Sequence, residues 1–199
     1  NMKYRELIYL VYSDLYRITR KTTKISLLWN VLFGKAFKYN FWMRVCSYTK
    51  RNIFLKYTLF PIARFILRHY TYKFGISISH QVKIGSGLYF GHFGGIIVHP
   101  RTIIGKNCNI QQGVTLGEVN RGKNKGVPII GDNVYIGPGA KVIGAIKVGN
   151  NVAIGSNCVV TKDVEDNAVV VGVPGKTISY NGSIGYISRT DYDSFLTRH

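Results

Sequence analysis

The chain has 199 residues, enough for one domain with a real core, and its 27 Lys and Arg against 9 Asp and Glu give a formal net charge of +18. The three cysteines are scattered, which excludes a disulfide framework or a CxxC metal pattern, and no apolar run reaches the roughly 18 residues that a bilayer span needs. With no signal-peptide pattern either, we expect a cytoplasmic protein that holds no metal.

Residues 1–74 are predicted to form a basic, aromatic-rich helical region. Apolar residues recur at helical spacing in YRELIYLVYSDLYRI and LLWNVLFGKAFKYNFWMRVCSY, and Pro61 starts or kinks a further segment. The region contains 15 basic and 2 acidic side chains. We expect a helical cap on the domain that follows, and its exposed face is suited to peripheral contact with an anionic membrane, at the inner face of the plasma membrane. Binding to nucleic acid is supported by the positive charge but by nothing else, because no zinc-finger, RRM, KH or helix-turn-helix signature is present. It is therefore not expected as the function of this region.

Residues 75–178 carry a six-residue repeat of aliphatic side chains. A short strand followed by a glycine-tolerant turn repeats with this period, whereas an amphipathic helix or a hairpin does not. Three such sides make one coil, so the pattern predicts an all-β, left-handed parallel β-helix. Residues 118–127 break the phase and are predicted to loop out. The series is Ile130, Ile136, Val142, Val148, Ile154 and Val160, and upstream it continues through Leu116, Ile110, Ile104 and Val98 to His92.

Other positions take their interpretation from this repeat. Cys108 and Cys158 fall at the small inward position and are predicted to fill the core. Residues 179–199 form a Gly/Ser/Tyr-rich tail that is expected to be extended or mobile. Five asparagines are placed to ease corners of positive φ, namely Asn107, Asn133, Asn150, Asn151 and Asn157.

His92 is the one member of the repeat series without an apolar side chain. A slip of two residues is predicted between Ile84 and His92, and glycines flank the histidine on both sides. An imidazole titrates near neutral pH and can take a proton from a hydroxyl, so His92 is the candidate base, with a purely structural histidine as the alternative. His99, beside Pro100, fits a surface or cleft position.

The blocks GHFGGIIV, IGKNCNIQQGVTLG, IGDNVYIGPGAKVIGAIKVGNNVAIGSNCVVTKDV and GVPGK resemble the hexapeptide-repeat acyltransferases, in the serine acetyltransferase branch. Within that branch the chain looks closest to O-acetyltransferases of capsule and exopolysaccharide clusters. The resemblance implies a homotrimer with active sites between neighbouring β-helices, acetyl-CoA as donor, and direct transfer with His92 as base. It also implies a pantetheine groove at Gly117, Gly137, Gly155 and Ser156, with Lys162 and Lys176 near the CoA phosphates. The glycines are also explained by turn geometry, and the two lysines are also explained as solvated surface residues.

Three positions depart from serine acetyltransferases. Ser77 replaces an aspartate fifteen residues before the histidine, and Gly91 replaces a second aspartate directly before it. Gly126-Val127 replaces an Arg-His pair in the loop. A backbone carbonyl, the Ser77 hydroxyl, or Glu118 of a neighbouring subunit could orient His92 instead. A site without partners for the charges of serine would leave them uncompensated, which favours a sugar hydroxyl in surface polysaccharide biosynthesis as the acceptor. The alternatives are a serine O-acetyltransferase of cysteine biosynthesis and a β-solenoid that binds membrane or nucleic acid without catalysis.

Overall fold

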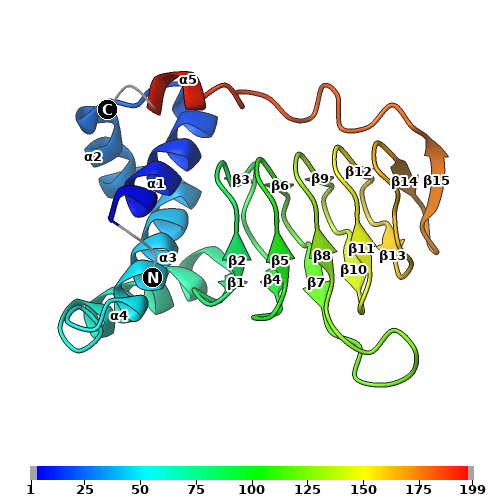
Figure 1. Ribbon diagram of the computed structural model, residues 1–199, viewed down its shortest axis with the longest axis horizontal. Coiled ribbons are helices and arrows are strands. Elements are labelled where there is room, and N and C mark those ends of the chain that lie inside the picture. The colour runs from blue at the N-terminus through cyan, green and yellow to red at the C-terminus, as the bar shows by residue number, and fades with distance from the viewer. Residues whose placement is uncertain (1–3, 197–199) are drawn as a thin grey trace.

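The computed structural model describes residues 4–196 as a block of helices joined end-on to a parallel β-helix (Figure 1). Thr23 caps the second helix, because its side-chain oxygen accepts a hydrogen bond from the Ser26 N–H at 3.2 Å. Gly75, with φ of +61°, ends the fourth. None of the helices within these residues is long and apolar enough to cross a membrane. The helices are α1 Tyr4–Thr19, α2 Lys24–Leu32, α3 Lys35–Arg51, α4 Leu59–Phe74 and α5 Asp193–Leu196.

Short strands form the three walls of the β-helix, and each strand pairs in parallel with its counterparts in the neighbouring coils. Among the strands of residues 4–196, β15 alone is antiparallel to its neighbour. Sheet A contains β1 Ile76–Ile78, β4 Ile96–Val98, β7 Thr115–Gly117, β10 Lys141–Ile143 and β13 Val159–Val160. Sheet B contains β2 Lys83–Ile84, β5 Ile103–Ile104, β8 Ile129–Ile130 and β11 Lys147–Val148. Sheet C contains β3 Tyr89–Phe90, β6 Asn109–Ile110, β9 Tyr135–Ile136, β12 Ala153–Ile154, β14 Val169–Val171 and β15 Lys176–Ser179.

The interior of the coil is the predicted aliphatic series. Ile110, Ile136 and Ile154 stand in register in sheet C, and all three are 0 % exposed. Cys108 and Cys158 are buried beside them, and burial raises the pKa of the Cys108 thiol to about 12, which suits packing and not nucleophilic chemistry. The left-handed β-helix predicted from the repeat is therefore confirmed.

Asparagines form a ladder along one corner of the coil. The side-chain amide of Asn107 donates to Asn133, Asn133 donates to Asn151, and Asn151 donates to Asn167, with N···O distances of 2.9–3.1 Å. All four residues have φ between +55° and +62°. Asn157 also has positive φ, at another corner. Asn150 does not, and its side chain instead accepts a hydrogen bond from the Asp132 N–H.

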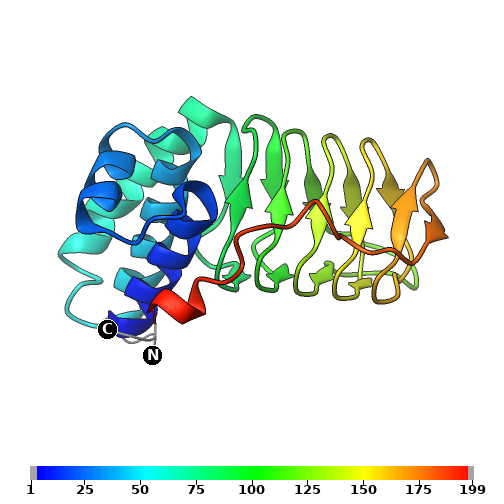
Figure 2. The ribbon, with the colours of Figure 1, turned by 90° about the horizontal axis from the view of Figure 1, so that it is seen from above.

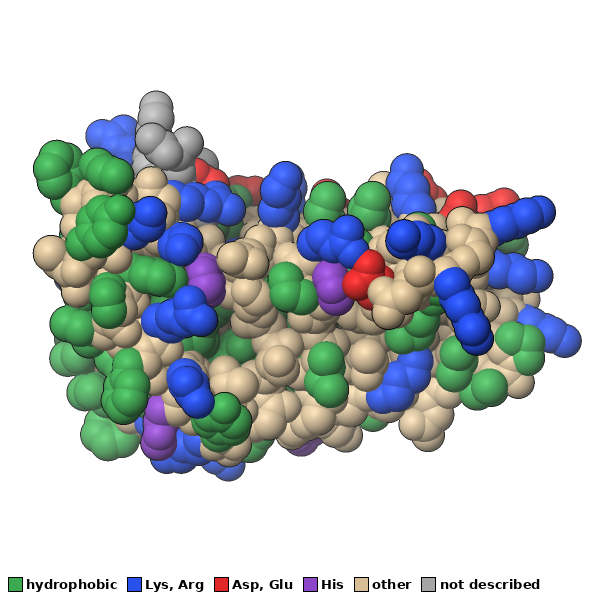
Figure 3. Space-filling view, turned by 90° about the horizontal axis from the view of Figure 1, so that it is seen from below, with side chains coloured by type: hydrophobic (Ala, Val, Ile, Leu, Met, Phe, Trp, Pro, Cys, Tyr) green, Lys and Arg blue, Asp and Glu red, His purple; other side chains and the backbone are tan. Residues whose placement is uncertain are grey.

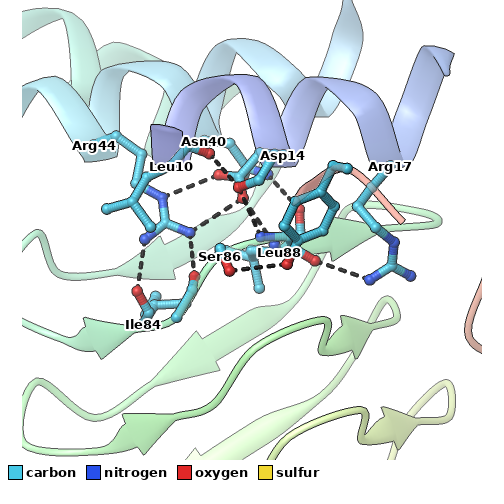
Figure 4. A network of polar contacts seen from close by, with 12 residues as sticks. Leu10, Asp14, Arg17, Asn40, Arg44, Ile84, Ser86 and Leu88 are labelled. Carbon is cyan, nitrogen blue, oxygen red and sulfur yellow. Dashed lines mark hydrogen bonds and ion pairs between the residues drawn. The ribbon is translucent and has the colours of Figure 1, made fainter. Parts of the chain in front are cut away.

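The helices cover the edge of the first coil, where no earlier coil supplies backbone partners. Asp14 accepts from the Leu88 N–H at 2.8 Å and from the Arg44 Nε at 3.0 Å, and Arg44 in turn donates to the carbonyls of Ile84 and Gly85 (Figure 4). Tyr39 also joins this edge, since its hydroxyl donates to the Ile78 carbonyl and accepts from the Ile78 N–H. Burial raises the pKa of the Asp14 carboxyl, and the Arg44 guanidinium opposes that rise. Side chains of the cap thus take the place of a missing strand.

The C-terminal tail is extended and lies against the coil. Figure 2 shows it running back from β15 along the coil to the helices. Ser183 donates to the Asn133 carbonyl at 2.6 Å, Tyr186 stacks on Tyr135 at 4.4 Å, and the Tyr192 hydroxyl bonds Ser86 and Asn107. Over residues 179–196 the tail is thus docked on the coil and ends in α5.

Candidate active site

His92 lies outside the coil, at the corner between sheets C and A. The inward position belongs to Phe90, which is 4 % exposed and pairs with Ile110, whereas the His92 side chain is exposed. The predicted placement of His92 in the aliphatic wall is therefore wrong, and so is the predicted site of the slip. The extra two residues lie after Phe90, where Gly94 and Gly95 take φ of +116° and +64° and turn the chain outward. Exposure leaves the imidazole available to a ligand.

A cavity of about 330 Å³ adjoins His92. It is enclosed by α1, by sheet C and by the tail, and its polar side chains include Arg17, Gln111 and Arg189. Within residues 4–196, no hydrogen bond or ion pair fixes the His92 ring. Within one copy, neither Ser77 nor Glu118 forms a hydrogen bond with the histidine, and its orientation by a neighbouring copy stays a prediction.

A second cavity, of about 590 Å³, holds Ser77, His99 and Gly117, between α4 and sheet A. His99 Nε2 lies 3.2 Å from the Glu118 carboxylate, and its Nδ1 accepts from the Arg101 N–H. Arg101 also pairs with Glu118 through its guanidinium. Both ring nitrogens of His99 are thus engaged, and the Arg101 guanidinium balances the charge of Glu118, so this group anchors the start of the 118–127 loop.

The residues expected to bind the donor lie at two separate corners. Gly137, Gly155 and Ser156 follow strands of sheet C, whereas Gly117 ends a strand of sheet A and Lys162 follows another. Lys176 begins β15, at the far end of the coil. At Gly137, an added Cβ would lie 2.8 Å from the Ile154 carbonyl oxygen, so close coil stacking alone requires that glycine. A single copy does not gather these residues into one groove.

Sequence reasoning missed the side chains around His92 that come from outside its own repeat. Arg17 belongs to α1 and Arg189 to the tail, and no motif links either residue to the histidine. Gln111 directly follows β6, where the repeat alone predicts only a turn. Within the described residues, no group of three or more His, Cys, Asp or Glu could hold a metal ion.

Comparisons with known proteins agree with this architecture. Residues 128–162 match the family "Bacterial transferase hexapeptide (six repeats)". A serine acetyltransferase of Helicobacter pylori is 41 % identical over 130 residues, which cover 65 % of this chain and 72 % of that protein. The chain belongs to the serine acetyltransferase family of hexapeptide-repeat transferases.

Further relatives match a shorter part of the chain. A serine acetyltransferase of Staphylococcus aureus is 44 % identical over 108 residues, 54 % of this chain and 51 % of its own length, and one of Synechococcus elongatus is 40 % identical, with 44 % of its length covered. The chain thus spans about half the length of these relatives. Among solved structures, Neisseria gonorrhoeae serine acetyltransferase in complex with serine has a TM-score of 0.70 at 29 % identity, covering 87 % of this chain and 69 % of that one. A serine acetyltransferase complex with CoA has a TM-score of 0.69 at 29 % identity, covering 88 % and 71 %.

These findings contradict the expectation of a sugar acceptor in polysaccharide biosynthesis. The relatives are serine acetyltransferases, and nothing among them supports a nearest branch of capsule or exopolysaccharide enzymes. The expectation rested on two positions where serine acetyltransferases carry charged side chains and this chain does not. These are Gly91 in the repeat and Gly126 in its loop. Two cations from outside the repeat, Arg17 of α1 and Arg189 of the tail, line the cavity beside His92.

Proposed function

We propose that this chain transfers the acetyl group of acetyl-CoA to the hydroxyl of L-serine, the reaction that commits serine to cysteine biosynthesis. The observation that carries this proposal is an exposed histidine at a corner of a hexapeptide coil, beside a polar cavity that contains two arginines. Membership of the serine acetyltransferase family and the solved relatives titled as complexes with serine and with CoA support it.

His92 acts as the base in this proposal. The imidazole takes the proton of the serine hydroxyl as the oxygen attacks the thioester carbonyl carbon. A backbone N–H steadies the oxyanion of the tetrahedral intermediate, which collapses by breaking the carbon–sulfur bond. The leaving thiolate takes the proton from the imidazolium, so the products are O-acetylserine and CoA, and His92 returns to its neutral form.

The donor site is proposed to form between copies in a homotrimer. The expected donor residues occupy two corners on either side of sheet A, Gly155 and Ser156 at one and Gly117 and Lys162 at the other. Packing of the corner of one coil against the other corner of its neighbour would bring the two sets together along one groove. Lys162 and Lys176 remain candidates for the CoA phosphates, because both are exposed cations.

Release of thiol from acetyl-CoA in the presence of L-serine tests the reaction, with O-acetylserine identified by mass. His92→Ala should lower turnover by roughly 10²- to 10⁴-fold, the range for loss of a general base. His69→Ala, on the exposed face of α4, is the matched control and should stay within twofold. Near-normal turnover by a well-folded His92→Ala variant would exclude His92 as the base, and release without acetylserine would exclude serine.

We also propose that the helical end makes peripheral contact with an anionic membrane. Six of the nine residues of α2 are apolar and none of the nine is buried, with Ile25 83 % exposed and Trp29 63 % exposed. Phe54, in the loop before α4, is 81 % exposed. Figure 3 shows large apolar side chains gathered over this end, with Lys and Arg among them. Like charge opposes pairing of two such ends, whereas acidic lipid complements them.

Sedimentation with vesicles tests this contact. The protein should co-sediment with phosphatidylglycerol vesicles at low salt and stay in solution with phosphatidylcholine vesicles, and Trp29→Ser should weaken binding severalfold. Ile184→Ser is the control, since Ile184 is 88 % exposed but lies in the tail. If the protein binds neither vesicle, the apolar face of α2 is exposed to solvent and the membrane contact is rejected. If Trp29→Ser changes the oligomeric state in the absence of vesicles, the face contacts a second copy and the membrane contact is likewise rejected.

A further inference from the structure

Arg17 is a buried guanidinium without a carboxylate partner. Its side chain is 3 % exposed, Nη1 donates to the Gly87 carbonyl at 2.9 Å, and Nη2 donates to Asn109 Oδ1 at 2.6 Å. Nε is buried and has no hydrogen-bond partner. Figure 4 shows the guanidinium standing apart from the Asp14–Arg44 pair. Within residues 4–196 no ion pair reaches it, although the centroid of the Tyr89 ring lies 5.7 Å from its Cζ and the Asp14 charge acts on it from farther away. Burial still lowers the pKa of Arg17, so its charge is only partly compensated.

The tail brings a second cation to the same cavity. Arg189 Nη1 donates to the carbonyls of Arg17 and Ile18, at 3.3 and 2.5 Å, and no described acid pairs with this guanidinium either. Tyr186, stacked on Tyr135, and the hydrogen bond from Asn109 to the Tyr186 carbonyl hold the tail in place. Two unpaired guanidinium groups thus line one small polar cavity with the candidate base. An anionic group bound there would supply the missing charge.

Gln111 fills the space that an aspartate before the histidine would need. A Cβ built on Gly91 would lie 2.4 Å from Gln111 Oε1 and 2.7 Å from Nε2, so no side chain fits at position 91 unless Gln111 moves. The change at Gly91 therefore replaces a carboxylate with a neutral amide, itself largely buried. With one negative charge fewer at this corner, the cavity is left positive, which favours an anion over a cation.

We propose that Arg17 and Arg189 form the subsite for the carboxylate of the amino-acid acceptor, an inference that rests on the proposed function. The acceptor lies in the cavity with its carboxylate on the two guanidinium groups and its hydroxyl toward His92. The phosphates of CoA are a second source of negative charge. The pantetheine arm keeps them away from the thioester, so they lie far from the base whenever the acetyl group is beside it. A carboxylate-recognition site is thus built from α1 and the tail and not from the 118–127 loop.

Calorimetric titration of the CoA-bound protein with L-serine and L-serinamide tests this subsite without turnover. Wild-type protein should bind L-serine roughly 10- to 100-fold more tightly than serinamide, the worth of a charge-assisted hydrogen bond. Arg189→Met should bind the two ligands equally, whereas Arg5→Met, an exposed arginine at the start of α1, should retain the preference. Equal affinity in the wild type, or an unchanged preference in Arg189→Met, would overturn the inference.

Two controls separate other causes. Tyr192→Phe removes tail hydrogen bonds while keeping both arginines, so it should retain the preference for L-serine if charge and not tail docking matters. If Arg189 instead held a CoA phosphate, Arg189→Met would bind CoA at least tenfold more weakly, and the subsite would be rejected. His92→Ala should weaken the binding of L-serine and of serinamide alike, because the hydroxyl is common to both, and should therefore keep the preference for L-serine. If the protein prefers L-serine to serinamide but forms no O-acetylserine, the proposed function is rejected and the subsite is kept. If it forms O-acetylserine without that preference, the subsite is rejected and the proposed function is kept.

Discussion

The coil and the junction with its helical cap are stabilised in opposite ways. In the coil, each interior position repeats the one before it, and apolar side chains such as Ile136 stack on their own kind. At the junction, Asp14, Arg44 and Tyr39 are buried and bond to the free backbone of the first coil. A repeat can supply its own hydrogen-bond partners everywhere except at its ends. The first coil therefore depends on a set of side chains that occurs only once.

The largest effect is expected from removing one member of the buried ion pair. Asp14→Ala leaves Arg44 buried without its carboxylate and the Leu88 N–H without an acceptor. Loss of one partner from such a pair costs about 3–5 kcal/mol in free energy of unfolding, measured by urea denaturation. Glu6→Ala, on the exposed start of the same helix, is the control and should change stability by less than about 0.5 kcal/mol. A cost below about 1 kcal/mol for Asp14→Ala would show that the coil edge does not need the cap.

A core deletion in the coil should cost slightly less and should not depend on which coil is chosen. Ile136→Ala and Ile154→Ala each remove a fully buried side chain from the same stack, and each should cost about 2–5 kcal/mol in free energy of unfolding. The two costs should agree within about 1 kcal/mol, because the packing around them repeats. A much larger difference between them would mean that neighbouring coils are not equivalent, and the contrast with the junction would fail.

The same contrast explains what could be predicted from the sequence. The six-residue period predicts the coil, the inward residues and the protruding loop, because each depends on neighbours at fixed separations. It misplaced His92, because a corner that absorbs two extra residues between Phe90 and Ile96 has no repeat to follow. Arg17 and Arg189 reach the cavity over long separations in the chain, and only the folded cap and tail bring them together. The predicted sugar acceptor rested on positions within the repeat and its loop alone, and the serine acetyltransferase relatives contradict it.

The asparagine ladder should give a moderate effect that separates backbone strain from hydrogen bonding. Asn133→Ala removes both ladder hydrogen bonds and places at φ of +55° an alanine, which tolerates the left-handed region less well than asparagine, and the two effects together should cost about 2 kcal/mol. Asn133→Gly loses the same hydrogen bonds but tolerates the φ angle, and should cost about 1 kcal/mol in the same urea experiment. Equal losses for the two variants would assign the whole effect to the hydrogen bonds.

The smallest effect concerns pH and returns to the junction. Burial lowers the pKa of His80, with Arg64 and Lys50 adding to the shift, and its buried Nε2 has no partner beside Phe60. The folded protein therefore binds fewer protons at this site than the unfolded chain. Stability from this group is present above the ordinary histidine pKa and is lost as the pH falls below it. His80→Asn should consequently reduce the fall in melting temperature between pH 7.5 and pH 5.5, whereas His69→Asn, on the exposed face of α4, should leave it unchanged. If the melting temperature falls equally in wild type and His80→Asn, the junction tolerates a charged imidazole at position 80. The polar interactions that matter at the junction would then be those of the Asp14–Arg44 network.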